Sequence, residues 1–140
     1  MTLYWGDKVN PKLYKKQIEE MGIDGLEIKP NSLIDATSML IELKEYQKIL
    51  QQIKYNVRID ARKISKEYIS KIDELNEQIK ETKKSERKAK KNKEAQKKLL
   101  KEREDKLAPY DGLDILIDGY LVQIEDSKIL LRDFIKKQVK

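Results

Sequence analysis

The sequence predicts an all-α fold: a long antiparallel helical hairpin (coiled coil), with a short N-terminal helix and a C-terminal helix packed at its base. Between Asn31 and Ala108 the chain has neither glycine nor proline for 78 residues, and these are the two strongest helix breakers. Within that stretch, apolar residues recur at every seventh position, which is typical of helices that pair along a seam. Charged residues make up 40% of the chain, so little core-forming material is available for its length.

Glycine and proline divide this single domain into three parts. Residues 1–31 form an N-terminal helix and connector, residues 32–108 the hairpin with a basic tip at 80–98, and residues 109–140 a C-terminal helical element. The first helix is expected to start at Asn10 and Pro11, a favoured N-cap followed by a residue tolerated at the first helical position. Gly22 stands where a C-terminal stop is expected.

The long segment begins with Ser32 as an N-cap and Asp35 three positions later, which approximates a capping box. Asp60 falls in the same register as the apolar seam that follows, so a charge occupies a core position. Beyond Ile64 the register jumps by four residues, a stutter that locally unwinds a supercoil. The predicted seam consists of Leu43, Tyr46, Leu50, Ile53, Val57, Ile64, Tyr68, Ile72, Leu75 and Ile79.

The hairpin requires a turn that the sequence marks only weakly. One helix is expected from about Ser32 to near Lys80, a polar turn within 82–92, and a second helix returning to about Leu107. From Thr82 to Gln96 the same register contains no apolar seam. One continuous rod with a solvated, charged stretch remains the alternative, because the tip contains neither glycine nor proline.

The C-terminal part permits two interpretations. Asp118 and Gly119 stand between two apolar segments, a pattern typical of a two-residue β-hairpin turn. The apolar residues of 113–135 also fall on one helical face. Because such a periodic pattern is long for strands, we expect a helix in which Gly119 is an interior residue.

The net charge of +6 is concentrated in one segment. Residues 80–98 contain ten Lys and Arg against three Glu, whereas the rest of the chain is close to neutral. A localised basic segment is suited to an anionic partner, and its ten cations could neutralise several phosphates. Tyrosine and phenylalanine are absent between Tyr68 and Tyr110, so contact with the backbone is expected rather than base readout. The predicted nucleic-acid-binding residues are Lys80, Lys83, Lys84, Arg87, Lys88, Lys90, Lys91, Lys93, Lys97 and Lys98.

The composition argues against catalysis. The chain has no Cys and no His, which excludes disulfides, thiolate chemistry, Cys/His zinc sites and histidine acid–base catalysis. Asp111, Asp114 and Asp118 could align carboxylates for Mg²⁺ or Ca²⁺, but a solvated stripe beside an apolar face is the commoner arrangement. No phosphate-binding glycine loop is present. We therefore expect a non-enzymatic protein with no cofactor, metal or small-molecule substrate.

The longest aliphatic runs are three residues, and the N-terminus lacks a basic-then-apolar signal pattern. The chain is therefore expected to be cytoplasmic, with no membrane association.

Residues 10–22, 40–50 and 58–67 resemble the N-terminal arm of seryl-tRNA synthetases, and the resemblance extends over about residues 10–107. The opening Asn-Pro-Lys-Leu is similar to the family's Asn-Pro-Glu-Leu, whereas Lys44 stands where the family has Asp. Motifs of the class II catalytic domain are missing. The resemblance implies an antiparallel coiled-coil arm, standing alone, that grips tRNA.

Two functions remain open. The first is a non-catalytic arm that binds nucleic acid, with tRNA or another RNA favoured by the resemblance. The second is a coiled-coil scaffold or adaptor that uses the seam from Leu43 to Ile79 to self-associate or to bind a partner protein.

Overall fold

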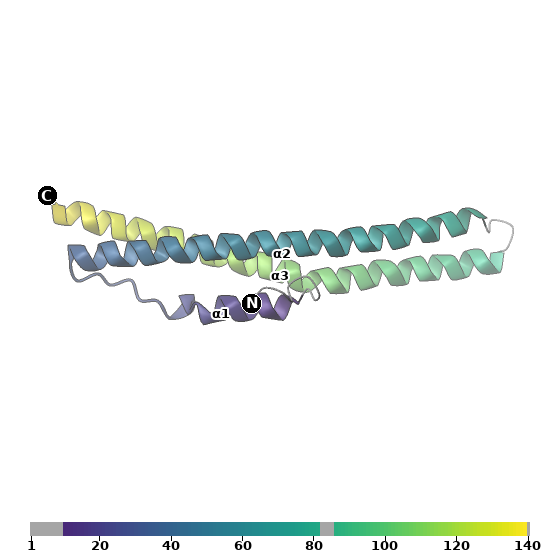
Figure 1. Cartoon of the computed structure of the whole chain (residues 1–140), viewed down its shortest axis with the longest axis horizontal. Coiled ribbons are helices and arrows are strands. Elements are labelled where there is room, and N and C mark those ends of the chain that lie inside the picture. Colours follow the sequence, from purple (N-terminus) through teal and green to yellow (C-terminus); the bar gives the residue numbers. More distant parts are fainter. Residues whose placement is uncertain (1–9, 82–85, 140) are drawn as a thin grey trace, which may run out of the picture. The chain divides into compact units, whose positions relative to one another are not determined.

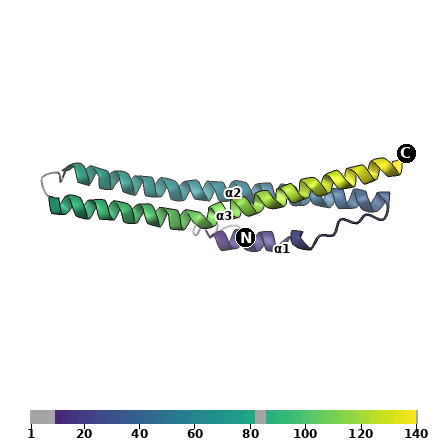
Figure 2. The same cartoon turned by 180° about the vertical axis from the view of Figure 1, so that it is seen from behind.

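The computed structural model describes residues 10–81 and 86–139, and in that part of the chain every regular element is a helix. The elements are α1 (Pro11–Glu20), the short 3₁₀ helix η2 (Ile23–Gly25), α2 (Leu33–Glu81) and α3 (Glu86–Val139), shown in Figure 1. The predicted all-α helical hairpin is confirmed, because α2 and α3 pack side by side in opposite directions (Figures 1 and 2). This pairing excludes the continuous rod.

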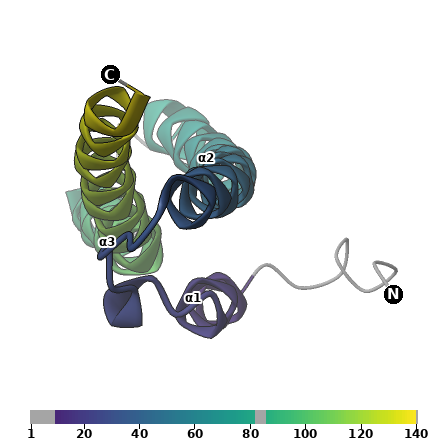
Figure 3. The same cartoon turned by 90° about the vertical axis from the view of Figure 1, so that its left-hand side faces the viewer.

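The chain divides into two compact units. Unit 1 comprises residues 1–57 together with 113–140, and unit 2 comprises residues 58–112. Both α2 and α3 contribute residues to each unit. The remaining α-helix, α1, belongs to unit 1, where Figure 3 shows it beside both long helices.

Local hydrogen bonds explain where α1 begins and ends. The backbone N–H of Lys12 donates to Asn10 Oδ1 at 3.0 Å, and Pro11 occupies the first turn, where a backbone N–H would have no intrahelical partner. The helix stops at Gly22, which adopts the left-handed conformation with φ 66°. Only glycine takes this conformation without a steric penalty, so Gly22 acts as the expected stop signal.

The start of α2 resembles the predicted capping box, except that the side chain of Asp35 pairs with the residue before the N-cap instead of with the N-cap itself. The backbone N–H of Asp35 donates to Ser32 Oγ at 3.1 Å, as an N-cap requires. The carboxylate of Asp35 in turn accepts from the backbone N–H of Asn31 at 2.9 Å, one residue before the N-cap. Two N–H groups that the helix itself cannot satisfy are therefore paired.

Unit 1 has an apolar core contributed by all of its helices. The buried apolar side chains are Tyr14, Ile18, Ile23, Ala36, Leu43, Leu50, Ile53, Val57, Leu113, Ile117, Ile124 and Leu131. Polar contacts between elements surround this core: Tyr120 Oη donates to Asp24 Oδ2 at 2.7 Å, and Lys128 Nζ donates to Gln47 Oε1 at 2.9 Å.

Unit 2 buries far less. Among its described residues only Asp60, Tyr68 and Tyr110 are buried, and the remaining seam positions Ile64, Ile72, Leu75 and Ile79 are half-exposed. Of the predicted seam in unit 1, Leu43, Leu50, Ile53 and Val57 are buried, and Tyr46 is half-exposed. Asp60 lies in the interior, at the position where its register predicted a core charge.

The predicted separation of the C-terminal helix from the hairpin is wrong. α3 continues from Glu86 to Val139 through Pro109 and Gly112, so the expected C-terminal helix is the second half of one helix. An interior proline removes a backbone hydrogen bond and costs roughly 3 kcal/mol. Tyr110 and Leu113, which follow it closely, are both buried, and this packing favours continuation of the helix. The helical interpretation of residues 113–135 is correct, and the β-hairpin alternative is not.

Candidate nucleic-acid interface

Those predicted cations that the structure describes lie near the end of α2 and along the beginning of α3, in unit 2. Lys80 is exposed near the end of α2. Lys83 and Lys84 lie outside the described residues. The other seven are exposed along the first turns of α3: Arg87, Lys88, Lys90, Lys91, Lys93, Lys97 and Lys98.

Four of these lysines form a repeating outer stripe. Lys90 and Lys91 recur seven residues later as Lys97 and Lys98, and residues seven apart share a helix face. The half-exposed residues that alternate with them are Ala89, Asn92, Ala95, Gln96 and Leu99, which form the inner face. We call the four lysines the basic stripe.

The inner face beneath the basic stripe contains polar pairs that the apolar register did not reveal. Gln96 Nε2 donates to Asn76 Oδ1 at 3.3 Å, and Arg103 Nη2 donates to Ser65 Oγ at 3.0 Å, each joining α3 to α2. In the sequence, this inner face is indicated by the recurrence of small and amide-bearing residues at Ala89, Asn92 and Gln96. This pattern leaves no apolar period, because Gln96 pairs with α2 through a hydrogen bond and Ala89 has only a small side chain.

The whole net charge of the protein lies in unit 2. Unit 2 contains 18 Lys and Arg against 12 Asp and Glu, whereas unit 1 contains 13 of each. Among the described residues, no carboxylate forms an ion pair with any lysine of the basic stripe. These ammonium groups therefore face solvent with their charge uncompensated by a contacting acid from that part of the chain.

Two further lysines of unit 2 flank a buried aromatic ring. The Nζ of Lys71 lies 4.9 Å from the ring centroid of Tyr68, and that of Lys106 lies 5.3 Å from it. Hydrogen bonding to Tyr68, followed by its charge when ionised, raises the pKa of Lys106. The ring is buried, so it positions cations rather than offering a face on which a base could stack.

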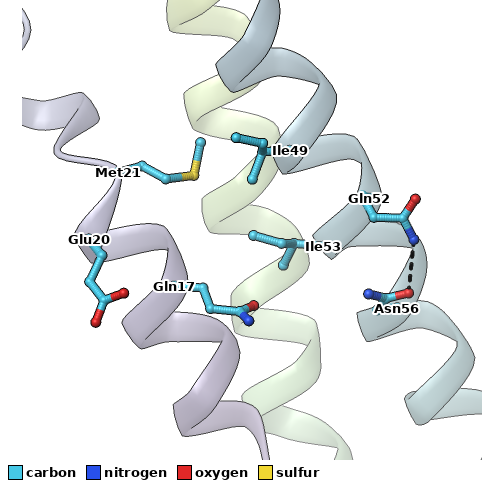
Figure 4. Close-up of a pocket in the computed structure, with 7 residues that line it drawn as sticks. All are labelled: Gln17, Glu20, Met21, Ile49, Gln52, Ile53 and Asn56. Atoms are coloured by element: carbon cyan, nitrogen blue, oxygen red, sulfur yellow. Dashed lines mark hydrogen bonds between the residues drawn. The ribbon is translucent and has the colours of Figure 1, made fainter. Parts of the chain in front are cut away.

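Unit 1 contains a pocket of about 480 Å³ between α1 and α2. Figure 4 shows its lining residues, Gln17, Glu20, Met21, Ile49, Gln52, Ile53 and Asn56. Gln52 Nε2 donates to Asn56 Oδ1 at 3.2 Å, so part of the amide lining is already paired. With one carboxylate and no cation in its lining, this pocket offers no positive charge to a phosphate.

Asp111, Asp114 and Asp118 all lie on α3, where Asp111 and Asp118 are exposed. Over residues 10–81 and 86–139, no group of three or more acidic side chains has an arrangement that could hold a metal ion. Asp118 instead forms an ion pair with Lys54. In the same part of the chain, none of the helices has the length and apolar character needed to cross a membrane.

Comparisons with protein-family models, with curated proteins and with solved structures gave no match.

Proposed function

We propose that the protein is a non-catalytic RNA-binding module that contacts the phosphate backbone through the basic stripe of α3. The observation that carries this proposal is the set of exposed lysines at 90, 91, 97 and 98, which have no contacting carboxylate among the described residues. Releasing counterions from phosphates is the principal source of sequence-independent affinity for such a surface.

Backbone contact explains the residue types better than base readout. Specific readout relies mainly on bidentate Arg, Asn and Gln and on exposed aromatic rings, whereas the stripe consists of lysines, which act as point charges. RNA is favoured over DNA by the resemblance to the tRNA-gripping arm of seryl-tRNA synthetases. A protein built in this way binds many sequences with similar affinity and responds strongly to salt.

The test is a quadruple variant, Lys90→Gln with Lys91→Gln, Lys97→Gln and Lys98→Gln. We expect weaker binding to mixed tRNA in a gel-shift series, and a log–log salt slope that is shallower by roughly 0.7–0.9 for each phosphate that the variant no longer neutralises. The helical content should not change, because all four side chains are exposed.

The matched control neutralises four exposed lysines of unit 1, at positions 15, 16, 136 and 137. It changes the net charge equally and should leave the salt slope near that of the wild type. If both variants weakened binding equally, net charge alone would explain the affinity. That outcome would contradict a particular role of the basic stripe. Wild-type protein that binds neither RNA nor DNA at about 50 mM salt would overturn the proposal, because electrostatic binding strengthens as salt decreases.

The scaffold function would need a surface other than the predicted seam. In unit 1 the predicted seam residues Leu43, Leu50 and Val57 are buried within the chain, so they are not available to another molecule. Self-association would have to use a different surface. Exposed apolar residues on the outer sides of α2 and α3 offer one.

A further inference from the structure

The outer side of α3 in unit 1 carries an apolar stripe that no described part of the chain covers. Ile115, Val122 and Ile129 are spaced by seven residues and therefore share one face, away from the buried residues of the same helix. Their exposed fractions are 73%, 61% and 52%. We call these three residues the α3 stripe.

The residues of this face are poor choices for a helix that simply faces water. Isoleucine and valine lose side-chain freedom in a helix, and Gly119, four residues after Ile115, weakens the helix further. Apart from Gly119 itself, its two neighbours and the adjacent backbone of α3, no heavy atom of the described chain lies within 4 Å of the position that a Cβ would take at Gly119, so packing within the chain does not require glycine there. A helix packing closely from outside would use both features, the branched side chains for contact and the glycine for close approach.

A second apolar stripe lies on the outer side of α2 in the same unit. Ile34, Ile41 and Tyr55 belong to one seven-residue series, and each is at least 61% exposed. The fourth member of the series is Lys48, whose aliphatic stem can continue the apolar surface while its charge reaches solvent. We call Ile34, Ile41, Lys48 and Tyr55 the α2 stripe.

The two stripes differ in net charge. Among the exposed residues of unit 1 that lie three or four positions from a member of the α3 stripe, or seven after its last member, four are acids and two are bases: Asp118, Glu125, Asp126, Asp133, Arg132 and Lys136. Around the α2 stripe such positions contain one base and one acid, Lys44 and Glu45, and the stripe itself contributes the positive charge of Lys48. Two copies of the α3 stripe facing each other would bring carboxylates together, whereas the α2 stripe matches it in spacing and in charge.

We propose that copies of this chain associate head to tail, with the α2 stripe of one copy packed on the α3 stripe of the next. The two stripes belong to different helices and lie away from the residues through which those helices pack on each other. Each copy in a pair therefore retains one unused stripe. Such a heterologous contact does not close on itself in a dimer, and assembly continues as concentration rises. The proposal is independent of RNA binding, because both stripes lie in unit 1.

The test uses two variants that each disable one stripe, Ile41→Glu and Val122→Glu. Both positions are exposed and glutamate is a good helix former, so we expect an unchanged circular dichroism spectrum. In sedimentation of nuclease-treated protein, the average mass of the wild type should rise with concentration to a multiple of the 16.6 kDa of one chain. Each variant alone should stay at the mass of one chain.

Mixing the two variants separates this contact from a symmetric one. One intact α3 stripe and one intact α2 stripe then remain, so the mixture should form a finite one-to-one complex of twice the single-chain mass. Gln123→Glu, an exposed position outside both stripes, should assemble like the wild type. The proposal is overturned by a wild type that stays monomeric at all concentrations, by a single-stripe variant that still self-associates, or by a mixture without a complex.

Discussion

Tyr110 has an unusual environment in unit 2. Its ring is buried, and its hydroxyl has no hydrogen-bond partner among the described residues. Burial, and then the negative charge of Asp60, raises the pKa of Tyr110 to about 12 from an ordinary value of 10.0. Both effects disfavour the tyrosinate form in the folded protein.

This raised pKa makes stability fall at alkaline pH. Below pH 10 the hydroxyl stays protonated in both the folded and the unfolded states. Between pH 10 and about 12 the unfolded chain releases the proton while the folded chain retains it, so the free energy of unfolding decreases. Asp60→Asn removes the nearby charge, and we expect it to lower the Tyr110 pKa and reduce that decrease.

The measurement compares urea unfolding at pH 9 and pH 11 with the absorbance change of tyrosinate formation. Tyr110→Phe is the reference variant, because it removes the titrating group and identifies its step among those of the seven tyrosines. An unchanged Tyr110 step in Asp60→Asn would mean that burial alone sets its pKa. If that step moved to higher pH, the assigned influence of Asp60 would be wrong.

At the scale of single elements, two glycines should respond oppositely to the same substitution. Gly112 lies inside α3 with nothing within 4 Å of a Cβ, so Gly112→Ala should stabilise the protein by about 0.5–1 kcal/mol. Gly22 ends α1 with φ 66°, where an L side chain is strained, so Gly22→Ala should destabilise by about 1 kcal/mol. Chemical denaturation of both variants checks the signs, and a stabilising Gly22→Ala would contradict the assigned stop.

The elements that the sequence predicted well are those marked by local chemistry. Asn10 and Ser32 cap the helices they were expected to cap, and Gly22 ends the first one. The interior course of α3 was harder to predict. Local preference at Pro109 argues for a break, whereas the burial of Tyr110 and Leu113 depends on distant parts of the chain.

The candidate site shows the same division between local and tertiary information. The positive charge of residues 80–98 can be counted in the sequence, so the cations themselves were found. The polar pairs beneath them were not, because Asn76 and Gln96 are twenty residues apart and meet only when α2 and α3 pack antiparallel. Hydrogen-bonded amides leave no apolar period for a sequence pattern to reveal.

At the scale of the whole molecule, the two units differ in how much they bury. Unit 1 encloses a dozen apolar side chains from α1, η2, α2 and α3. The described part of unit 2 encloses Tyr68, Tyr110 and the charged Asp60, and its remaining contacts are half-exposed side chains and polar pairs. Local opening is easiest where few apolar contacts hold an element.

Hydrogen exchange should therefore distinguish the two units, although α2 and α3 each run through both of them. We expect amides of residues 64–80 and 87–105 in unit 2 to exchange at least about tenfold faster than those of residues 40–56 and 114–131 in unit 1, a difference of about 1.4 kcal/mol in opening free energy. Exchange measured by mass spectrometry on peptides from each range provides the comparison. Adding tRNA at low salt should slow exchange in unit 2 and leave unit 1 unchanged, since the basic stripe belongs to unit 2. Equal rates in both units would show that the chain opens cooperatively as a whole, with the polar pairs of unit 2 contributing as much as the apolar core of unit 1.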